Sequence, residues 1–190
     1  SYSEDSVKGD SIEIIDNAYG MEWADFQRAI ILDSPPKNTD GRHEYGMGLK
    51  TAACWFGKKW TVESTELHSS RLFKTTVDVD DLSKNKTETI LVKKTPISPN
   101  RHYTKIVITN LNQQLKGRRI PSQLSKMLGS TYRCDLRKGK IQISYNGTLV
   151  SYKEQIPYVE TIGDGKYELK KQISFDVNHK GKLLRVRGFA

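Results

Sequence analysis

Four glycines lie within seventeen residues in the segment GRHEYGMGLKTAACWFG (41–57). Gly46 and Gly48 come directly before a run of helix-forming residues, which Gly57 ends. A glycine loop that leads into a helix presents unpaired N–H groups and the positive end of the helix dipole, and both favour phosphate. A tight turn needs the same backbone freedom. The segment alone therefore leaves a phosphate site and a structural turn as alternatives.

Two further segments place polar and small residues at the ends of predicted strands. DNAYGM (16–21) has an aspartate at a strand end, with small residues two and four positions later. YTKIVITNL (103–111) is a predicted strand that opens with a tyrosine and a threonine. On its own, Asp16 also has an interpretation as a helix N-cap.

Hydrophobic periodicity predicts the elements that must position these segments. Alternating residues predict strands at 11–16, 59–67, 71–79, 87–94 and 104–111, and helical spacing predicts helices at 21–32, 48–56 and 121–132. DDLSKNK (80–86) is expected to be a connector, and Asn146-Gly147 predicts a hairpin within 140–151. The aromatic residues expected in the core are Trp23, Phe26, Trp55 and Phe56.

The order of these elements predicts the α+β class. A strand, a helix, a loop, a second helix and a run of antiparallel strands form a two-layer sandwich, with a mixed, mostly antiparallel sheet and helices on one face. Repeated βαβ units are missing, which excludes a doubly wound dinucleotide fold, and no G-x-x-x-x-G-K-[ST] segment indicates a P-loop. Strand-like segments at 167–177 and 182–189 indicate the start of a second, strand-rich domain.

The composition limits the partners of the chain. Its 190 residues include 31 Lys and Arg against 22 Asp and Glu, a net charge of +9. Basic stretches at 116–119, 133–140 and 180–187 indicate attraction to nucleic acid or nucleotide phosphate, with a solvated surface as the alternative for each stretch. No reader motif indicates sequence-specific DNA recognition, so any DNA contact is expected to be nonspecific.

Other classes of protein find little support in the sequence. The two cysteines and four histidines have no metal-ligand or redox spacing, which leaves a reducing compartment as the expectation. No apolar run approaches the length of a membrane span, and no signal peptide is visible. We expect a cytoplasmic protein, or a nuclear one in a eukaryote, with no membrane partner.

Together the three segments resemble the GHKL superfamily of ATPases, which have the Bergerat ATP-binding fold. This superfamily includes gyrase B subunits, ninety-kilodalton heat-shock chaperones, MutL-type repair proteins, histidine kinases and MORC-type ATPases. The segments occur in the family's order, and the resemblance covers residues 1–150. GLKTAA and NGTLVS are most similar to the MORC-type branch and related prokaryotic ATPases. Residues 151–190 resemble the opening strands of the transducer domain that follows in the chaperone and repair branches.

The resemblance implies ATP and Mg²⁺ as ligands. Asp16 matches the aspartate that accepts a hydrogen bond from the adenine amino group, and an ionised carboxylate is an acceptor only. Gly46 and Gly48 match glycines whose backbone wraps the phosphates, and Thr104 matches a threonine that helps hold the aspartate and a water. The residues implied to contact ATP are Asp16, Ala18, Gly20, Met21, Tyr45, Gly46, Met47, Gly48, Leu49, Lys50 and Thr104.

Three positions depart from the family pattern. Ala18 replaces the first glycine of the D-x-G-x-G box, a small change that is tolerated unless φ is positive there. His43 stands where the phosphate box has its first glycine, and Tyr103 replaces the glycine that precedes the threonine. These changes leave the loop conformation and the assignment of Thr104 open.

The family's general base, a glutamate, and its Mg²⁺ ligand, an asparagine, lie on a helix before the Asp16 strand. No E-x-x-x-N spacing precedes Asp16, and SYSED (1–5) resembles the tail of that helix. We expect both residues upstream of Ser1, and no catalytic or metal residue is assigned in this chain. The expected function is ATP binding and hydrolysis, with closure of a lid at 33–48, nucleotide-dependent dimerisation and an open possibility of action on DNA. The alternatives are a non-catalytic nucleotide-binding module and a basic nucleic-acid-binding domain with a structural glycine loop.

Overall fold

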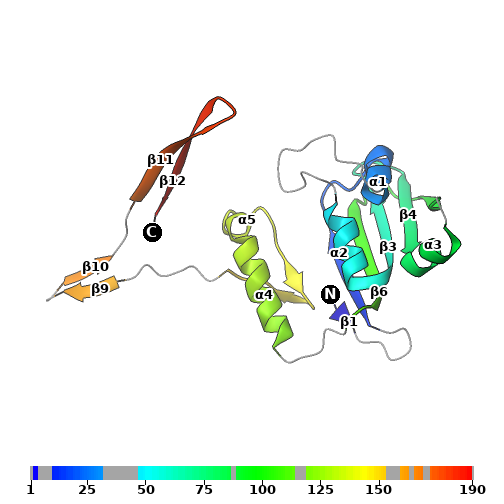
Figure 1. The fold of residues 1–190 in the computed structure, drawn as a ribbon, viewed down its shortest axis with the longest axis horizontal. Coiled ribbons are helices and arrows are strands. Elements are labelled where there is room, and N and C mark those ends of the chain that lie inside the picture. The colour runs from blue at the N-terminus through cyan, green and yellow to red at the C-terminus, as the bar shows by residue number, and fades with distance from the viewer. Residues whose placement is uncertain are drawn as a thin grey trace.

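The computed structural model describes residues 2–3, 10–31, 47–86, 89–113, 119–152, 159–162, 165–168 and 172–189. Its largest unit is a six-stranded sheet with strand order β1-β2-β6-β3-β4-β5 (Figure 1). Every neighbouring pair in this sheet is antiparallel. The strands are β1 (Tyr2–Ser3), β2 (Ser11–Asp16), β3 (Gly57–Thr65), β4 (Arg71–Asp78), β5 (Val92–Pro96) and β6 (Tyr103–Leu111). This sheet, with helices packed on it, confirms the predicted α+β sandwich.

Helices α1 (Trp23–Ile30) and α2 (Gly48–Phe56) cover one face of the sheet (Figure 1). Strand β3 turns Trp60 and Val62 toward them, because alternate residues of a strand lie on the same face. The centre of the core is Phe26 on α1, which is completely buried. The buried core residues are Phe26, Ile30, Ala53, Trp60, Val62, Phe73, Val77 and Ile108.

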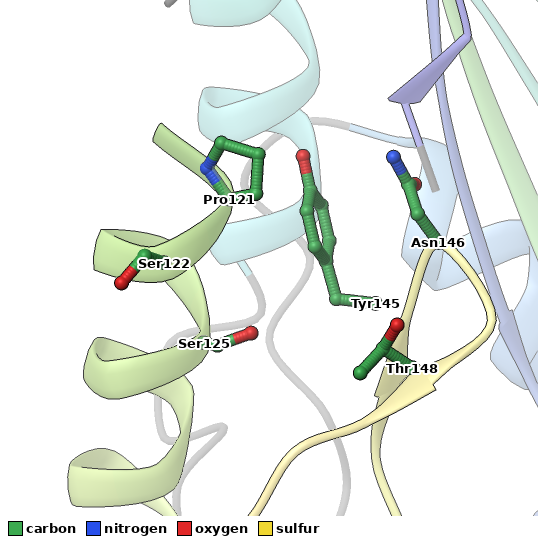
Figure 2. Close-up of a pocket in the computed structure, with 6 residues that line it drawn as sticks. All are labelled: Pro121, Ser122, Ser125, Tyr145, Asn146 and Thr148. Atoms are coloured by element: carbon green, nitrogen blue, oxygen red, sulfur yellow. The ribbon is translucent and has the colours of Figure 1, made fainter. Parts of the chain in front are cut away.

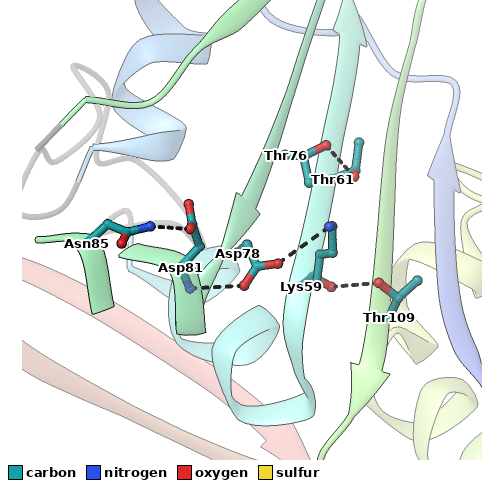
Figure 3. Close-up of polar contacts among 7 residues, drawn as sticks. All are labelled: Lys59, Thr61, Thr76, Asp78, Asp81, Asn85 and Thr109. Carbon is teal, nitrogen blue, oxygen red and sulfur yellow. Dashed lines mark hydrogen bonds and ion pairs between the residues drawn. The ribbon is translucent and has the colours of Figure 1, made fainter. Parts of the chain in front are cut away.

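The opposite face of the sheet is polar, as Figure 3 shows for part of it. The hydroxyls of Thr61 and Thr76 lie 2.9 Å apart across β3 and β4. Lys59 pairs with Asp78 at 3.4 Å, and its carbonyl accepts a hydrogen bond from the Thr109 hydroxyl at 3.3 Å (Figure 3). This face is therefore held by cross-strand polar pairs, whose individual contributions are small.

Helix α3 (Val79–Asn85) forms where a connector was predicted. Asp78 caps it by accepting a hydrogen bond from the Asp81 amide at 3.2 Å, and this bond is the main reason that the pKa of Asp78 is lowered. Two further acids, Asp80 and Asp81, stand in the first turn, where the helix dipole favours negative charge. The prediction was wrong because a capped, charged turn has no apolar periodicity to reveal it.

Two predicted helix ends also differ from the structure. Helix α1 begins at Trp23 rather than Met21, so Asp16 is not its N-cap. Gly57 does not end α2 in a left-handed conformation, because its φ of −157° is extended and it is the first residue of β3. A Cβ at Gly57 would lie 2.5 Å from the Thr109 carbonyl oxygen, so the close approach of two strands explains the glycine.

The expected burial of the α2 aromatics is wrong. Trp55 is 76% exposed and Phe56 is 42% exposed. The sheet-facing stripe of α2 runs through the half-buried Leu49 and the buried Lys50 and Ala53. Trp55 lies off this stripe, because residues three and four apart share a helix face and Trp55 is two residues after Ala53. Phe56 is three residues after Ala53, but it is the last residue of the helix.

The first strand and the fourth expected strand need smaller corrections. Tyr2 and Ser3 pair with Ile12 and Ser11, so they are extended rather than the tail of a helix. The strand predicted at 87–94 is β5, which spans Val92–Pro96.

A helix pair and a short hairpin follow β6. Helices α4 (Ile120–Thr131) and α5 (Arg133–Arg137) precede strands β7 (Ser144–Tyr145) and β8 (Thr148–Leu149). The predicted hairpin is confirmed, since Asn146 and Gly147 form its turn with φ values of 47° and 78°. Gly129 of α4 lies against the backbone after this hairpin, where a Cβ would be 2.7 Å from the Ser151 carbonyl oxygen.

The last described segments form two antiparallel hairpins. Strand β9 (Val159–Ile162) pairs with β10 (Gly165–Glu168), and β11 (Gln172–His179) pairs with β12 (Lys182–Phe189). They agree with the predicted strand character, while the division at residue 150 stays a prediction. None of the helices in the described part of the chain is long and apolar enough to cross a membrane.

Candidate nucleotide site

The candidate site lies where β2 ends and β6 begins. Antiparallel pairing places Asp16 of β2 directly opposite Thr104 of β6. On its other side Thr104 is paired with Ser64, near the end of β3. Three residues that are distant in sequence therefore lie side by side at one end of the sheet.

The turn after Asp16 requires its glycine. Gly20 has a φ of +74°, and a Cβ there would lie 1.9 Å from the Thr65 carbonyl oxygen. The Leu67 amide donates to the Tyr19 carbonyl at 2.8 Å and joins this turn to the end of β3. Gly20, the single glycine of the DNAYGM segment, thus allows the turn to pack directly on the β3 backbone.

Ser64 of β3 connects the DNAYGM segment to the start of β6. Its buried hydroxyl accepts a hydrogen bond from the Met21 amide at 3.0 Å and lies 3.0 Å from the Thr104 hydroxyl. It also donates toward the Tyr103 carbonyl at 3.2 Å. Ser64 has a single proton. When that proton points to Thr104, the proton of Thr104 is available to a ligand or a water.

The Asp16 carboxylate is exposed at the end of its strand. Its Oδ1 accepts a hydrogen bond from the Ala18 amide at 3.1 Å, which orients the group. The Ala18 carbonyl lies 2.8 Å from Nδ1 of His102 and is thereby joined to the residues before β6. Ala18 does not have a positive φ, so the replacement of the family glycine leaves this backbone unstrained.

The start of α2 presents backbone N–H groups that the helix itself does not pair. The first residue of the helix is Gly48, and the N-cap residue Met47 makes no side-chain cap hydrogen bond. The first N–H groups of a helix have no partner within it. A Cβ at Gly48 would meet nothing within 4 Å, so packing within the described residues does not demand a glycine there. An approaching ligand is a reason for that glycine.

Helix α2 begins at the same end of the sheet as Asp16 (Figure 1). The helix leads directly into β3 and runs back along it, and β3 finishes beside Thr104. Leu49 and Met21 both pack on the core under the site, and Lys50 is only 4% exposed. The predicted Tyr45 and Gly46, with most of the expected lid at 33–48, lie outside the described residues.

Tyr103, which departs from the family pattern, points away from this site. Its hydroxyl donates to Glu63 at 2.5 Å on the polar face of the sheet, while the neighbouring Thr104 faces Ser64. Burial, followed by this bond, raises the pKa of Tyr103 to about 12. For Glu63, burial alone would raise the pKa, but hydrogen bonds from Tyr103 and Lys74 lower it. A side chain in place of the family glycine is accommodated because it occupies the opposite face.

Sequence reasoning missed Ser64, Thr65 and His102. Ser64 and Thr65 are completely buried, at a strand end where apolar residues are usual. The Thr65 hydroxyl has no hydrogen-bond partner among the described residues. Two adjacent hydroxyl residues at the end of an otherwise alternating strand were the available signal.

Comparison with known proteins identifies the class of this fold. The family model described as "Histidine kinase-, DNA gyrase B-, and HSP90-like ATPase" matches residues 1–117. The chain belongs to this family of ATPase domains, which confirms the resemblance stated from the sequence. A comparison with curated proteins finds no significant match.

Two solved structures illustrate the likeness. The ATPase region of Saccharomyces cerevisiae topoisomerase II, bound to dexrazoxane, is 15% identical with a TM-score of 0.46, over 74% of this chain and 39% of that one. The ATPase and transducer domains of DNA topoisomerase II from Balamuthia mandrillaris are 24% identical with a TM-score of 0.34, over 51% of this chain and 28% of that one. The chain thus spans well under half of either relative.

Proposed function

We propose that the chain binds ATP and ADP between the end of β2 and the start of α2. The observation that carries this proposal is that Asp16 pairs in register with Thr104, and the Thr104 hydroxyl and the Met21 amide both contact the buried Ser64 hydroxyl. A hydroxyl that joins the DNAYGM segment to the start of β6 gives the base-binding end of the site a defined geometry. Membership of an ATPase-domain family supports a nucleotide as the ligand.

Each group has a distinct task in this proposal. The Asp16 carboxylate, oriented by the Ala18 amide, accepts the adenine amino group. Thr104 holds the carboxylate or a water through its hydroxyl, which lies 3.0 Å from that of Ser64. The uncapped start of α2 receives phosphate, and Gly48 lets the phosphate approach the backbone closely. Met21 and Leu49 form the apolar floor.

Mg²⁺ and hydrolysis are proposed for the protein without being assigned to these residues. No group of three His, Cys, Asp or Glu residues in the described parts of the chain could hold a metal ion. Mg²⁺, when bound, would supply charge neutralisation at the phosphates. None of the residues assigned here is a general base. A nucleotide-binding module without hydrolysis is therefore the second candidate function.

Two further proposals concern assembly and partners. Nucleotide-dependent dimerisation is proposed from the family membership alone. A nonspecific contact with DNA is proposed from the net charge of +9. Both are independent of the geometry that carries nucleotide binding.

Calorimetric titration of ADP and ATP into wild-type protein and Asp16→Asn tests the proposed site. The substitution removes a charged acceptor, and hydrogen bonds to charged groups contribute about 1.5–3 kcal/mol. We expect affinity to fall about 10- to 150-fold, equally for ADP and ATP, because the contact is to the base. Asp80→Asn is the matched control, since Asp80 lies on α3 in an exposed pair with Lys58. A folded Asp16→Asn protein with wild-type ADP affinity would refute the assignment.

A further inference from the structure

More than half of the net charge of +9 lies in one described segment of the chain. Residues 10–113, which contain the sheet, have 14 Lys and Arg and 14 Asp and Glu, so their net charge is zero. The described segment 119–152 has six Lys and Arg against the single acid Asp135, a net charge of +5. This segment contains α4, α5 and the hairpin β7–β8.

Part of the positive charge of residues 10–113 is paired with acids. On the sheet, Lys58, Lys59 and Lys74 pair with acids at 3.2, 3.4 and 3.0 Å. In the α4–α5 region, five exposed cations make no ion pair with any residue in the described part of the chain. These five residues, called the basic stripe below, are Arg119, Lys126, Arg133, Lys138 and Lys140.

The basic stripe follows the course of the two helices. Arg119, Lys126 and Arg133 recur every seven residues, and seven residues are about two helical turns. Arg119 at the N-cap and Lys126 within α4 therefore share one side of that helix. Arg133 opens α5, and Lys138 and Lys140 follow its end. Exposed cations thus continue from one helix to the next.

A hollow of about 220 Å³, whose lining includes hydroxyl and amide side chains, lies between α4 and the hairpin (Figure 2). It is separate from the nucleotide site. Ser122 and Ser125 lie on the α4 side of the hollow, and Tyr145 rises from the hairpin between them and Asn146 (Figure 2). Its six lining residues are Pro121, Ser122, Ser125, Tyr145, Asn146 and Thr148.

We propose that the basic stripe and this hollow bind the phosphodiester backbone of nucleic acid without regard to sequence. Unpaired Lys and Arg gain by displacing the counterions condensed on a polyanion. Hydroxyl and amide side chains are the uncharged groups that commonly contact phosphate and sugar. The site deepens the proposed DNA contact by locating it, and it does not depend on ATP binding.

Fluorescence anisotropy with a labelled duplex of about 20 bp tests this proposal, across the salt range where phosphate contacts respond strongly. If all five cations contact phosphates, the logarithm of the association constant should fall with the logarithm of the salt concentration with a slope of about −4.5. Affinity should then fall about 500-fold as salt rises from about 50 to about 200 mM. The triple variant Lys126→Gln, Arg133→Gln, Lys138→Gln leaves two of the five cations, so its slope should be about −1.8. Its affinity should fall only about 12-fold over the same salt range. Two duplexes of unrelated sequence should bind equally.

The matched control is Lys58→Gln, Lys59→Gln, Lys74→Gln, which removes the same charge from exposed, paired lysines of the sheet. We expect the control to stay folded and to bind the duplex like wild type, and both triple variants to bind ADP equally. An equal loss of DNA affinity in the two triple variants would overturn the proposal, because net charge alone would then explain binding. Preference for one duplex sequence, or binding to phosphatidylserine vesicles but not to DNA, would overturn it too.

Discussion

Replacing Gly20 by alanine should destabilise the fold itself. The new Cβ would lie 1.9 Å from the Thr65 carbonyl oxygen and 2.6 Å from its carbonyl carbon, so the turn or β3 must move. An L-residue at a φ of +74° adds about 1–2 kcal/mol of backbone strain. Overpacking in a tight site adds about 1–3 kcal/mol. We therefore expect Gly20→Ala to lower the free energy of unfolding by about 2–5 kcal/mol.

Urea unfolding measures this loss, and Gly48→Ala is its control. Gly48 has open space at its Cβ position and begins a helix, where alanine is favoured over glycine by up to about 1 kcal/mol. The control should be as stable as wild type or slightly more stable. If Gly20→Ala unfolds at the wild-type urea concentration, the turn does not pack on Thr65 and the described geometry of the site is wrong.

Two further predictions concern the polar contacts around the site. In urea unfolding, Ser64→Ala should lower the free energy of unfolding by about 1–3 kcal/mol, because it leaves the Met21 amide without its acceptor. Thr65→Val should be neutral or stabilising, because the Thr65 hydroxyl has no partner among the described residues. Equal losses of stability in the two variants would contradict the role of Ser64. The pKa of Glu63 is lowered from 4.5, so its contribution to stability is complete above that pH and is lost as the pH falls through the folded-state value. Glu63→Gln should flatten the acid side of a stability–pH profile. The pKa of Tyr103 is raised from 10.0 to about 12, so stability should be lost as pH rises through that range in wild type but not in Tyr103→Phe.

The sheet and the main helices were predictable because their signals are local. Alternation of apolar residues in β3 and β6 and the Asn146-Gly147 turn depend on neighbouring residues only. Segment type and approximate bounds followed from them. The three site segments were recognisable because their order and their glycines are themselves sequence features.

The connections across the site were not predictable in this way. Ser64 becomes the shared partner of Met21 and Thr104 only when β3 and β6 pair in one particular register. Strand register depends on contacts distant in sequence. The exposure of Trp55 likewise depends on which stripe of α2 meets the sheet, and apolar composition alone does not specify that stripe.

Amide hydrogen exchange with and without ADP tests the proposed nucleotide site most directly. Peptides that cover residues 16–21 and 47–51 should both gain protection, because the base end and the phosphate end of one ligand cover them together. Peptides from α4 and from the β11–β12 hairpin should exchange equally in both conditions. Unchanged exchange in both site segments, at an ADP concentration that saturates binding, would contradict the site at the ends of β2 and β3.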